Sequence, residues 1–230
     1  MVLRALEQVG SSPFQGLATL FSSILALLVA ITIHEASHAL SASLQGDPTA
    51  RNLGRLTLNP LAHLDPLGTI MILLAGFGWG RPVPVNPAFL RAGERSGMAV
   101  VSLAGPISNV AVAILVAIPI NTGMVGTGYD WLSSFRGQPG DVLGYVLGTV
   151  IFWNLLLAAF NLIPIAPLDG FKVALGLLPR EVAQGFARLE RYGPAILMSV
   201  IALDLFLLKW GVLAHIILPI IGVLDILVRW

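Results

Sequence analysis

Four long apolar runs and one shorter run dominate the pattern of this 230-residue chain, separated by stretches rich in proline, glycine and arginine. A helix of about 20 apolar residues crosses a hydrocarbon core of about 30 Å, which the long runs satisfy. The pattern predicts an all-α polytopic membrane protein with about five spanning helices. Their expected ranges are 14–44, 98–120, 142–163, 194–208 and 211–228.

The segment between the first two runs does not fit a spanning helix. Residues 67–77 are apolar but number only about 11, which is too few to cross the membrane. The stretch that follows, 78–87, contains Pro82, Pro84 and Pro87, which remove backbone donors and favour extended backbone. We therefore expect a partial or re-entrant element followed by a β-like stretch.

The composition agrees with a membrane protein. Hydrophobic residues make up 56% of the chain and charged residues 11%, whereas soluble domains carry about 25% charged residues. The net charge of +1 provides no broad basic surface for nucleic acid, and the lack of cysteine excludes disulfides and thiolate metal ligands. Residues 1–12 contain no clear small-residue cleavage site, so no removable signal peptide is expected.

The positions of lysine and arginine predict the topology. Segment 45–97 has five of these residues and segment 164–193 has four, whereas the polar loop 121–140 has one. The positive-inside rule then places the two basic segments in the cytoplasm and the loop outside. The protein is expected in the cell membrane, as a multi-pass protein of the prokaryotic plasma-membrane type.

Candidate chemistry lies late in the first apolar run, at His34-Glu35-Ala36-Ser37-His38. On a helix, His34 and His38 are four apart and share one face, so both can bind one metal ion. Glu35 lies beside them, which is the arrangement of zinc peptidases in which two histidines hold Zn²⁺ and a glutamate activates water. Ionisable groups are costly within an apolar segment, which favours a functional role over a chance match.

A catalytic zinc site needs a third protein ligand. Asp169 is the best candidate, because it follows the third long run, where Pro164 and Pro167 break the helix, and lies on the same predicted side as His38. The alternative is that Asp169 caps the helix that begins near Phe171. The remaining candidates are weaker and have structural explanations; they include His63, Asp65, His215, Asp204 and Asp225.

Three motifs together resemble the site-2 protease family of intramembrane zinc metalloproteases. They are the His34–His38 motif, Gly105-Pro106-Ile107-Ser108-Asn109, and the stretch from Asn161 to Gly170 that ends in Pro-Leu-Asp-Gly. The motifs and their order cover about residues 20–180. Together with the Gly-Trp-x-x-Pro-Val-Pro-Val-Asn stretch, they resemble those of a compact, mostly prokaryotic branch of this family. The chain departs from larger members, because it shows neither an inserted PDZ domain nor an appended CBS domain.

The resemblance implies one zinc ion held by His34, His38 and Asp169, with Glu35 as the general base. It also implies that residues 79–87 form a membrane-dipping edge for substrate near the metal. The residues expected to contact substrate are Asn161, Asn109, Val83 and Val85.

The expected function is hydrolysis of peptide bonds in or near transmembrane segments of membrane proteins, within one membrane-embedded domain over 1–230. Its catalytic core covers about 14–180, and a helical pair follows at about 194–229. The expected partners are transmembrane protein substrates and the lipid bilayer. Two alternatives are a catalytically silent member that binds transmembrane partners and a metal or cation transporter. The intact Glu35 counts against the former, and the lack of an internal repeat counts against the latter.

Overall fold

Helices account for nearly all regular structure in the computed structural model of the chain, which describes residues 13–75, 78–125, 142–204 and 211–229. The α-helices are α2 (Pro13–Leu44), α3 (Thr49–Asn52), α4 (Pro66–Ala75), α5 (Glu94–Asn121), α6 (Val142–Asn161), α7 (Asp169–Leu177), α8 (Arg180–Ala187), α9 (Gly193–Leu203) and α10 (Gly211–Val228). Short 3₁₀ turns lie at η1 (Pro60–Ala62), η2 (Pro87–Phe89) and η4 (Glu190–Tyr192).

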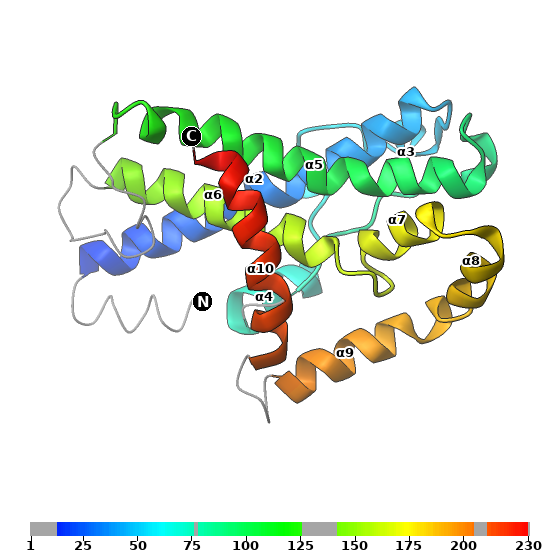
Figure 1. The fold of residues 1–230 in the computed structure, drawn as a ribbon. Coiled ribbons are helices and arrows are strands. Elements are labelled where there is room, and N and C mark those ends of the chain that lie inside the picture. Colours follow the sequence, from blue (N-terminus) through cyan, green and yellow to red (C-terminus); the bar gives the residue numbers. More distant parts are fainter. Residues whose placement is uncertain (1–12, 76–77, 126–141, 205–210, 230) are drawn as a thin grey trace.

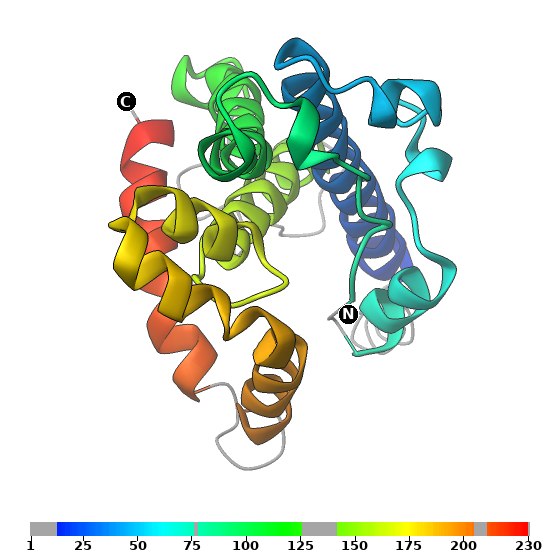
Figure 2. The same ribbon diagram turned by 90° about the vertical axis from the view of Figure 1, so that its right-hand side faces the viewer.

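The centre of the molecule is a bundle of α2, α5 and α6, which run side by side (Figures 1 and 2). Small side chains line the contacts between these helices, including the fully buried Ala30, Ala39, Ala113 and Ala158. Small residues let helix backbones approach closely, which is how helices associate in lipid, where apolar burial offers little gain. The short helix α7 packs along α5, and α10 crosses α5 and α6 (Figure 1).

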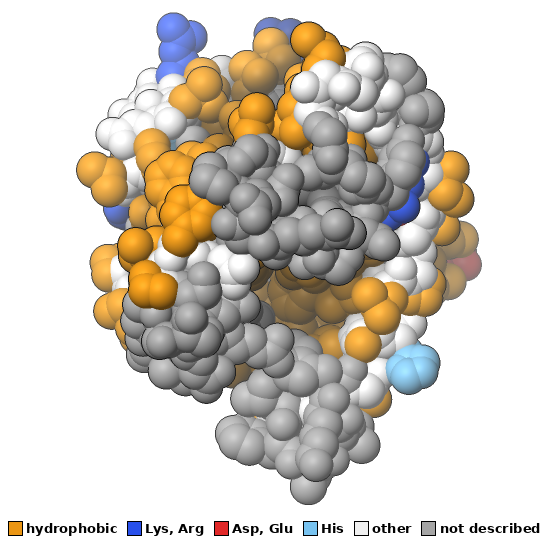
Figure 3. All heavy atoms as spheres, turned by 90° about the vertical axis from the view of Figure 1, so that its left-hand side faces the viewer, with side chains coloured by type: hydrophobic (Ala, Val, Ile, Leu, Met, Phe, Trp, Pro, Cys, Tyr) orange, Lys and Arg blue, Asp and Glu red, His pale blue; other side chains and the backbone are white. Residues whose placement is uncertain are grey.

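Among the described residues, four helices are long and apolar enough to cross a membrane: α2, α5, α6 and α10. Large apolar side chains such as Leu17, Phe21 and Leu115 are more than half exposed, as expected for a surface that meets lipid. Figure 3 shows one face on which hydrophobic side chains predominate over charged ones among the described residues, with a recess whose floor is hydrophobic. The prediction of an all-α polytopic membrane protein is therefore confirmed.

The fifth predicted span, 194–208, stays a prediction. Helix α9 covers its first part with 11 residues, and residues 205–210 lie outside the described part of the chain. Most of the predicted loop 121–140 and residues 1–12 also lie outside it.

The predicted short element between the first two spans is present as α4, a helix of 10 residues. Such a helix is about 15 Å long, half of a hydrocarbon core. The proline-rich stretch after it is extended, and its pairing with the rest of the described chain is a single antiparallel bridge between Leu64 and Gly80.

Candidate metal centre and its cavity

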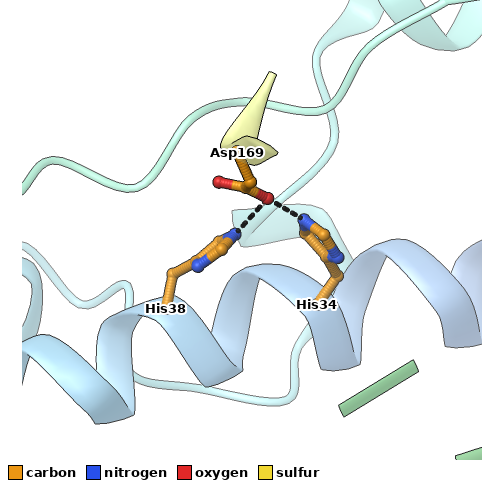
Figure 4. A group of neighbouring side chains, drawn as sticks. All are labelled: His34, His38 and Asp169. Atoms are coloured by element: carbon orange, nitrogen blue, oxygen red, sulfur yellow. Dashed lines mark hydrogen bonds and ion pairs between the residues drawn. The ribbon is translucent and has the colours of Figure 1, made fainter. Parts of the chain in front are cut away.

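The two histidines of the first motif lie in the last third of α2 and face the interior of the helix bundle. His34 and His38 are 4% and 7% exposed, although they belong to a helix that is largely apolar. Their rings meet edge to face with centroids 4.6 Å apart, because residues four apart are stacked on one helix face. Both side chains point away from the helix axis toward the same place (Figure 4).

Asp169 reaches that place from the opposite side. Helix α6 ends at Asn161, the chain turns through Pro164 and Pro167, and α7 then begins at Asp169 itself. One carboxylate oxygen, Oδ2, lies 3.0 Å from His34 Nε2 and 3.2 Å from His38 Nε2 (Figure 4). The N-cap of α7 is Leu168, and no side chain caps the N-terminus of this helix. The carboxylate of Asp169 therefore meets the histidines and does not serve as a helix cap.

The other ring nitrogens of the histidines have acceptors of their own. His34 Nδ1 lies 2.6 Å from Asn109 Oδ1, and His38 Nδ1 lies 2.8 Å from the carbonyl oxygen of Val101. The Asn109 amide group in turn donates to Ala30 O and to Asn154 Oδ1, which fixes its oxygen toward His34. Each Nδ1 can therefore donate its proton to a fixed acceptor, which leaves each Nε2 as the atom that would bind a metal.

Helix α5 supplies both of these acceptors. Pro106, within this helix, has no N–H to donate to Ser102 O. The neighbouring carbonyl oxygen, Val101 O, accepts the bond from His38. No sequence signal marked Val101, whereas Asn109 was marked by the Gly105–Asn109 motif and is a polar residue in an apolar span.

The three side chains fit a zinc ion. Their nearest ligand atoms all lie within 4.8 Å of one another. Zn²⁺ binds imidazole nitrogen and carboxylate oxygen at about 2.0–2.2 Å, so tetrahedral donors lie about 3.3–3.6 Å apart, slightly more than the 3.0 and 3.2 Å seen here. Gly105 leaves room beside them, because a Cβ there would lie 2.6 Å from His38 Nε2 and from the Cε1 atoms of both rings.

The protonation of Asp169 also suits a metal ligand. Burial raises the pKa of this carboxyl, but the hydrogen bonds and charges of His34 and His38 outweigh burial and hold the pKa well below its ordinary range. Asp169 is therefore ionised at neutral pH and offers an anionic oxygen.

Glu35 lies beside this group and lines the same cavity, which has a volume of about 620 Å³. The extended stretch that begins at Gly80 lines the same cavity as Glu35. A Cβ on Gly80 would lie 3.5 Å from Glu35 Oε1 and 3.2 Å from Ile31 Cγ2. The extended backbone at Gly80 therefore lies next to the Glu35 carboxylate, and an added Cβ would be crowded by Ile31 and by the carbonyl oxygen of His63.

Two buried charged residues hold the extended stretch in place. The Arg55 guanidinium donates to the carbonyl oxygens of Arg81 and Pro82, at 2.5 and 2.9 Å. Asp47 Oδ2 accepts a 2.7 Å bond from the backbone N–H of Asn86 at the other end. Both anchors are less than 7% exposed, so the backbone between them is held at a defined distance from Glu35.

The residues expected to contact substrate fall into two groups. Val83, Val85 and Asn161 line the cavity. The Asn161 side chain donates a 3.0 Å bond to Leu157 O within its own helix. Asn109 is fully buried and is not part of the cavity lining, and it contacts His34. Its geometry suits the positioning of a ligand.

The weaker candidates have structural contacts away from the metal centre. His63 is fully buried and bonds to Thr57 O at 2.8 Å, and His215 bonds to Gly211 O in its own helix. Asp225 forms an ion pair with Arg229 at 2.6 Å. Asp204 accepts a 2.6 Å bond from Val212 N.

Comparison with known proteins identifies several relatives. A Bacillus subtilis protein named "Putative zinc metalloprotease YwhC" is 42% identical over 170 residues, which is 74% of this chain and 75% of that protein. Two proteins named "Putative zinc metalloprotease Rip2" are more distant. The one from Mycolicibacterium smegmatis is 29% identical over 76% of this chain, and the one from Mycobacterium tuberculosis H37Rv is 30% identical over 74%.

The chain spans 64% and 62% of the length of these two mycobacterial relatives. No protein-family model matches the chain, and no solved structure matches it. The identity of 42% over three quarters of the Bacillus protein shows common descent. Since the motifs and the fold agree with it, the chain belongs to the site-2 protease family of zinc metalloproteases.

Proposed function

We propose that this protein is an intramembrane zinc metalloendopeptidase, which hydrolyses peptide bonds in or beside transmembrane segments of membrane proteins. The observation that carries the proposal is that His34, His38, Asp169 and Glu35 line one largely apolar cavity between helices long enough to span a membrane. The names of the relatives support a zinc-dependent protease. The location of the cavity supports a substrate that lies within the bilayer.

In this proposal, His34, His38 and Asp169 hold the ion and Glu35 is the general base. Bound zinc would polarise the peptide carbonyl and lower the pKa of the attacking water. Glu35 takes a proton from that water and delivers it to the leaving amine, which requires a carboxylate within hydrogen-bond reach of both. Asn109 and Val101 keep the two imidazoles in the ligating tautomer throughout.

The extended stretch supplies a surface for the substrate backbone. Within the described chain, the backbone N–H and C=O groups of Val83 and Val85 have no hydrogen-bond partner. Alternate residues of a strand point to the same edge, whereas Pro82 and Pro84, on the other edge, have no N–H. A locally unwound substrate would therefore pair with the edge formed by Val83 and Val85, close to Glu35.

We also propose that the metal centre faces the cytoplasm, in a multi-pass protein of the cell membrane. The segment 45–97, which follows the end of α2 and contains both anchors of the extended stretch, has five arginines. By the positive-inside rule, this end of the bundle lies on the cytoplasmic side. Asn161 remains a candidate for contact with the substrate, from its place in the cavity wall.

The decisive experiment compares the wild type with Glu35→Gln, using a single-span reporter protein and the purified enzyme reconstituted in liposomes. Glu35→Gln should keep one zinc per chain and lower cleavage by about 10²–10⁴-fold, the usual contribution of a general base. Glu181→Gln is the matched control, because Glu181 is an exposed glutamate on α8, and it should cleave at the wild-type rate.

The outcomes separate the alternatives. Undiminished cleavage by Glu35→Gln would remove this residue from the mechanism. Reporter binding without cleavage by the wild type would indicate a silent family member, and zinc uptake into the liposomes without cleavage would indicate a transporter.

A further inference from the structure

Arg95, in the first turn of α5, closes the far end of the short helix that carries Asp169. Its Nε lies 2.5 Å from Leu175 O and its Nη2 lies 3.1 Å from Gly176 O. Nη2 also bonds to Leu178 O, just beyond the helix. One guanidinium thus bonds to three carbonyl groups at the C-terminal end of α7.

Helix α7 depends on such contacts because it is short. It has nine residues, and isolated helices of fewer than about 12–15 residues are marginal even in favourable sequences. The last four carbonyl groups of a helix have no partner within it, and no side chain caps its N-terminus at Leu168. Arg95 therefore supplies the main polar anchor of α7, and its positive charge lies at the negative end of the helix dipole.

Close packing joins α7 to its neighbours at both ends. A Cβ on Gly176 would lie 2.3 Å from Ala99 Cβ, and a Cβ on Gly170 would lie 2.2 Å from Leu162 O. The helix thus contacts α5 at its end and the preceding loop at its start. Phe171, only 1% exposed, stacks on Phe186 at a centroid distance of 4.7 Å.

We propose that Arg95 is a positioning residue for metal binding. By fixing the C-terminus of α7 to α5, it holds Asp169, at the other end of the same helix, within reach of the two histidines. Asp169 Oδ2 must stay near two Nε2 atoms at once, so a small tilt of α7 breaks the ligand geometry. Helix α5 also carries Asn109 and Val101, so one helix fixes all three ligands relative to one another.

The inference rests on the proposed metal site and is tested by zinc affinity. Purified full-length protein in detergent is titrated against a chromophoric zinc chelator, without any activity assay. Arg95→Met should bind zinc at least about 10-fold more weakly, in the range for residues that support a metal ligand. Arg95→Lys, which offers a point charge and cannot reach three carbonyl groups, should show an intermediate loss of about threefold or more.

Two further proteins complete the test. Arg188→Met is the matched control, because Arg188 is an exposed arginine beyond α8 without a side-chain hydrogen bond or ion pair in the described chain, and it should keep wild-type affinity. In an Asp169→Asn background, Arg95→Met should have little additional effect, because the ligand through which it acts is already impaired.

The results distinguish this inference from the proposed site. If Asp169→Asn binds zinc as tightly as the wild type, the proposed ligand set itself is wrong. If Asp169→Asn weakens binding but Arg95→Met and Arg95→Lys do not, Arg95 has no positioning role. Should Arg95→Met fail to fold, Arg95→Lys decides the question, and wild-type affinity in that variant overturns the inference.

Discussion

The buried amide of Asn109 offers the sharpest test of how the helix bundle prepares His34 to bind a metal. Its Oδ1 lies 2.6 Å from His34 Nδ1, and the two side chains are 0% and 4% exposed, so water cannot replace the amide. In Asn109→Leu, a side chain of similar size without an acceptor, the Nδ1–H of the ligating tautomer loses its partner.

The size of the effect follows from this burial. An unsatisfied buried donor costs about 1–3 kcal/mol, and this cost applies to the ligating tautomer and not to the one protonated on Nε2. At 1.4 kcal/mol per factor of ten, zinc affinity should fall by about 5- to 150-fold, which includes the 10–100-fold range measured for such supporting residues. Competition with a chromophoric zinc chelator measures this change directly.

Asn154→Leu is the matched control. Asn154 accepts a 2.8 Å bond from the Asn109 amide and is equally buried, but it does not contact His34. This variant should lose stability and keep zinc affinity within about threefold, since the Oδ1–Nδ1 bond remains. Zinc affinity of Asn109→Leu within twofold of the wild type, in protein with unchanged helicity, would refute the tautomer argument.

Two further predictions concern the room beside the metal and the anchor of the extended stretch. Gly105→Ala should abolish zinc binding, because the added Cβ would lie 2.6 Å from both imidazole rings. Metal content measures the loss of zinc, and circular dichroism should show little change in helicity. Full zinc content in this variant would contradict the prediction. Burial raises the pKa of Asp47, but bonds from Thr49 and Asn86 outweigh it, so the pKa lies below its ordinary value of 3.8. A lowered folded-state pKa stabilises the protein above pH 3.8, and this contribution is lost as the pH falls. Asp47→Asn should therefore lower the Tm at pH 7 by about 2–10 °C, with a difference that shrinks in acid; a constant difference would argue against an ionised Asp47.

Local periodicity explains why so much of the fold could be predicted. The ranges expected for α2 and α10 match those observed, because a helix in lipid bonds only within itself and an apolar run of sufficient length has no other stable form. The spacing of His34 and His38 likewise places them on one face whatever surrounds them. Proline at 164 and 167 marked the end of α6 for the same local reason.

The metal centre as a three-dimensional object depends on contacts between distant parts of the chain. Asp169 is 135 residues from His34, and spacing left open whether it bound a metal or capped a helix. The structure shows its carboxylate against both histidines, because α7 is packed on α5 and bonded there by Arg95.

What the sequence by itself determined is therefore the set of apolar helices, the pair of histidines and the extended character of the proline-rich stretch, all set by interactions between near neighbours. Only the tertiary structure decided which atoms complete the site. Asn109 was expected to contact substrate, yet it faces His34, and the carbonyl oxygen of Val101 carries no sequence signal at all. The physical reason is that helix packing fixes the direction of each polar group, and every buried polar group must then find its partner where packing places it.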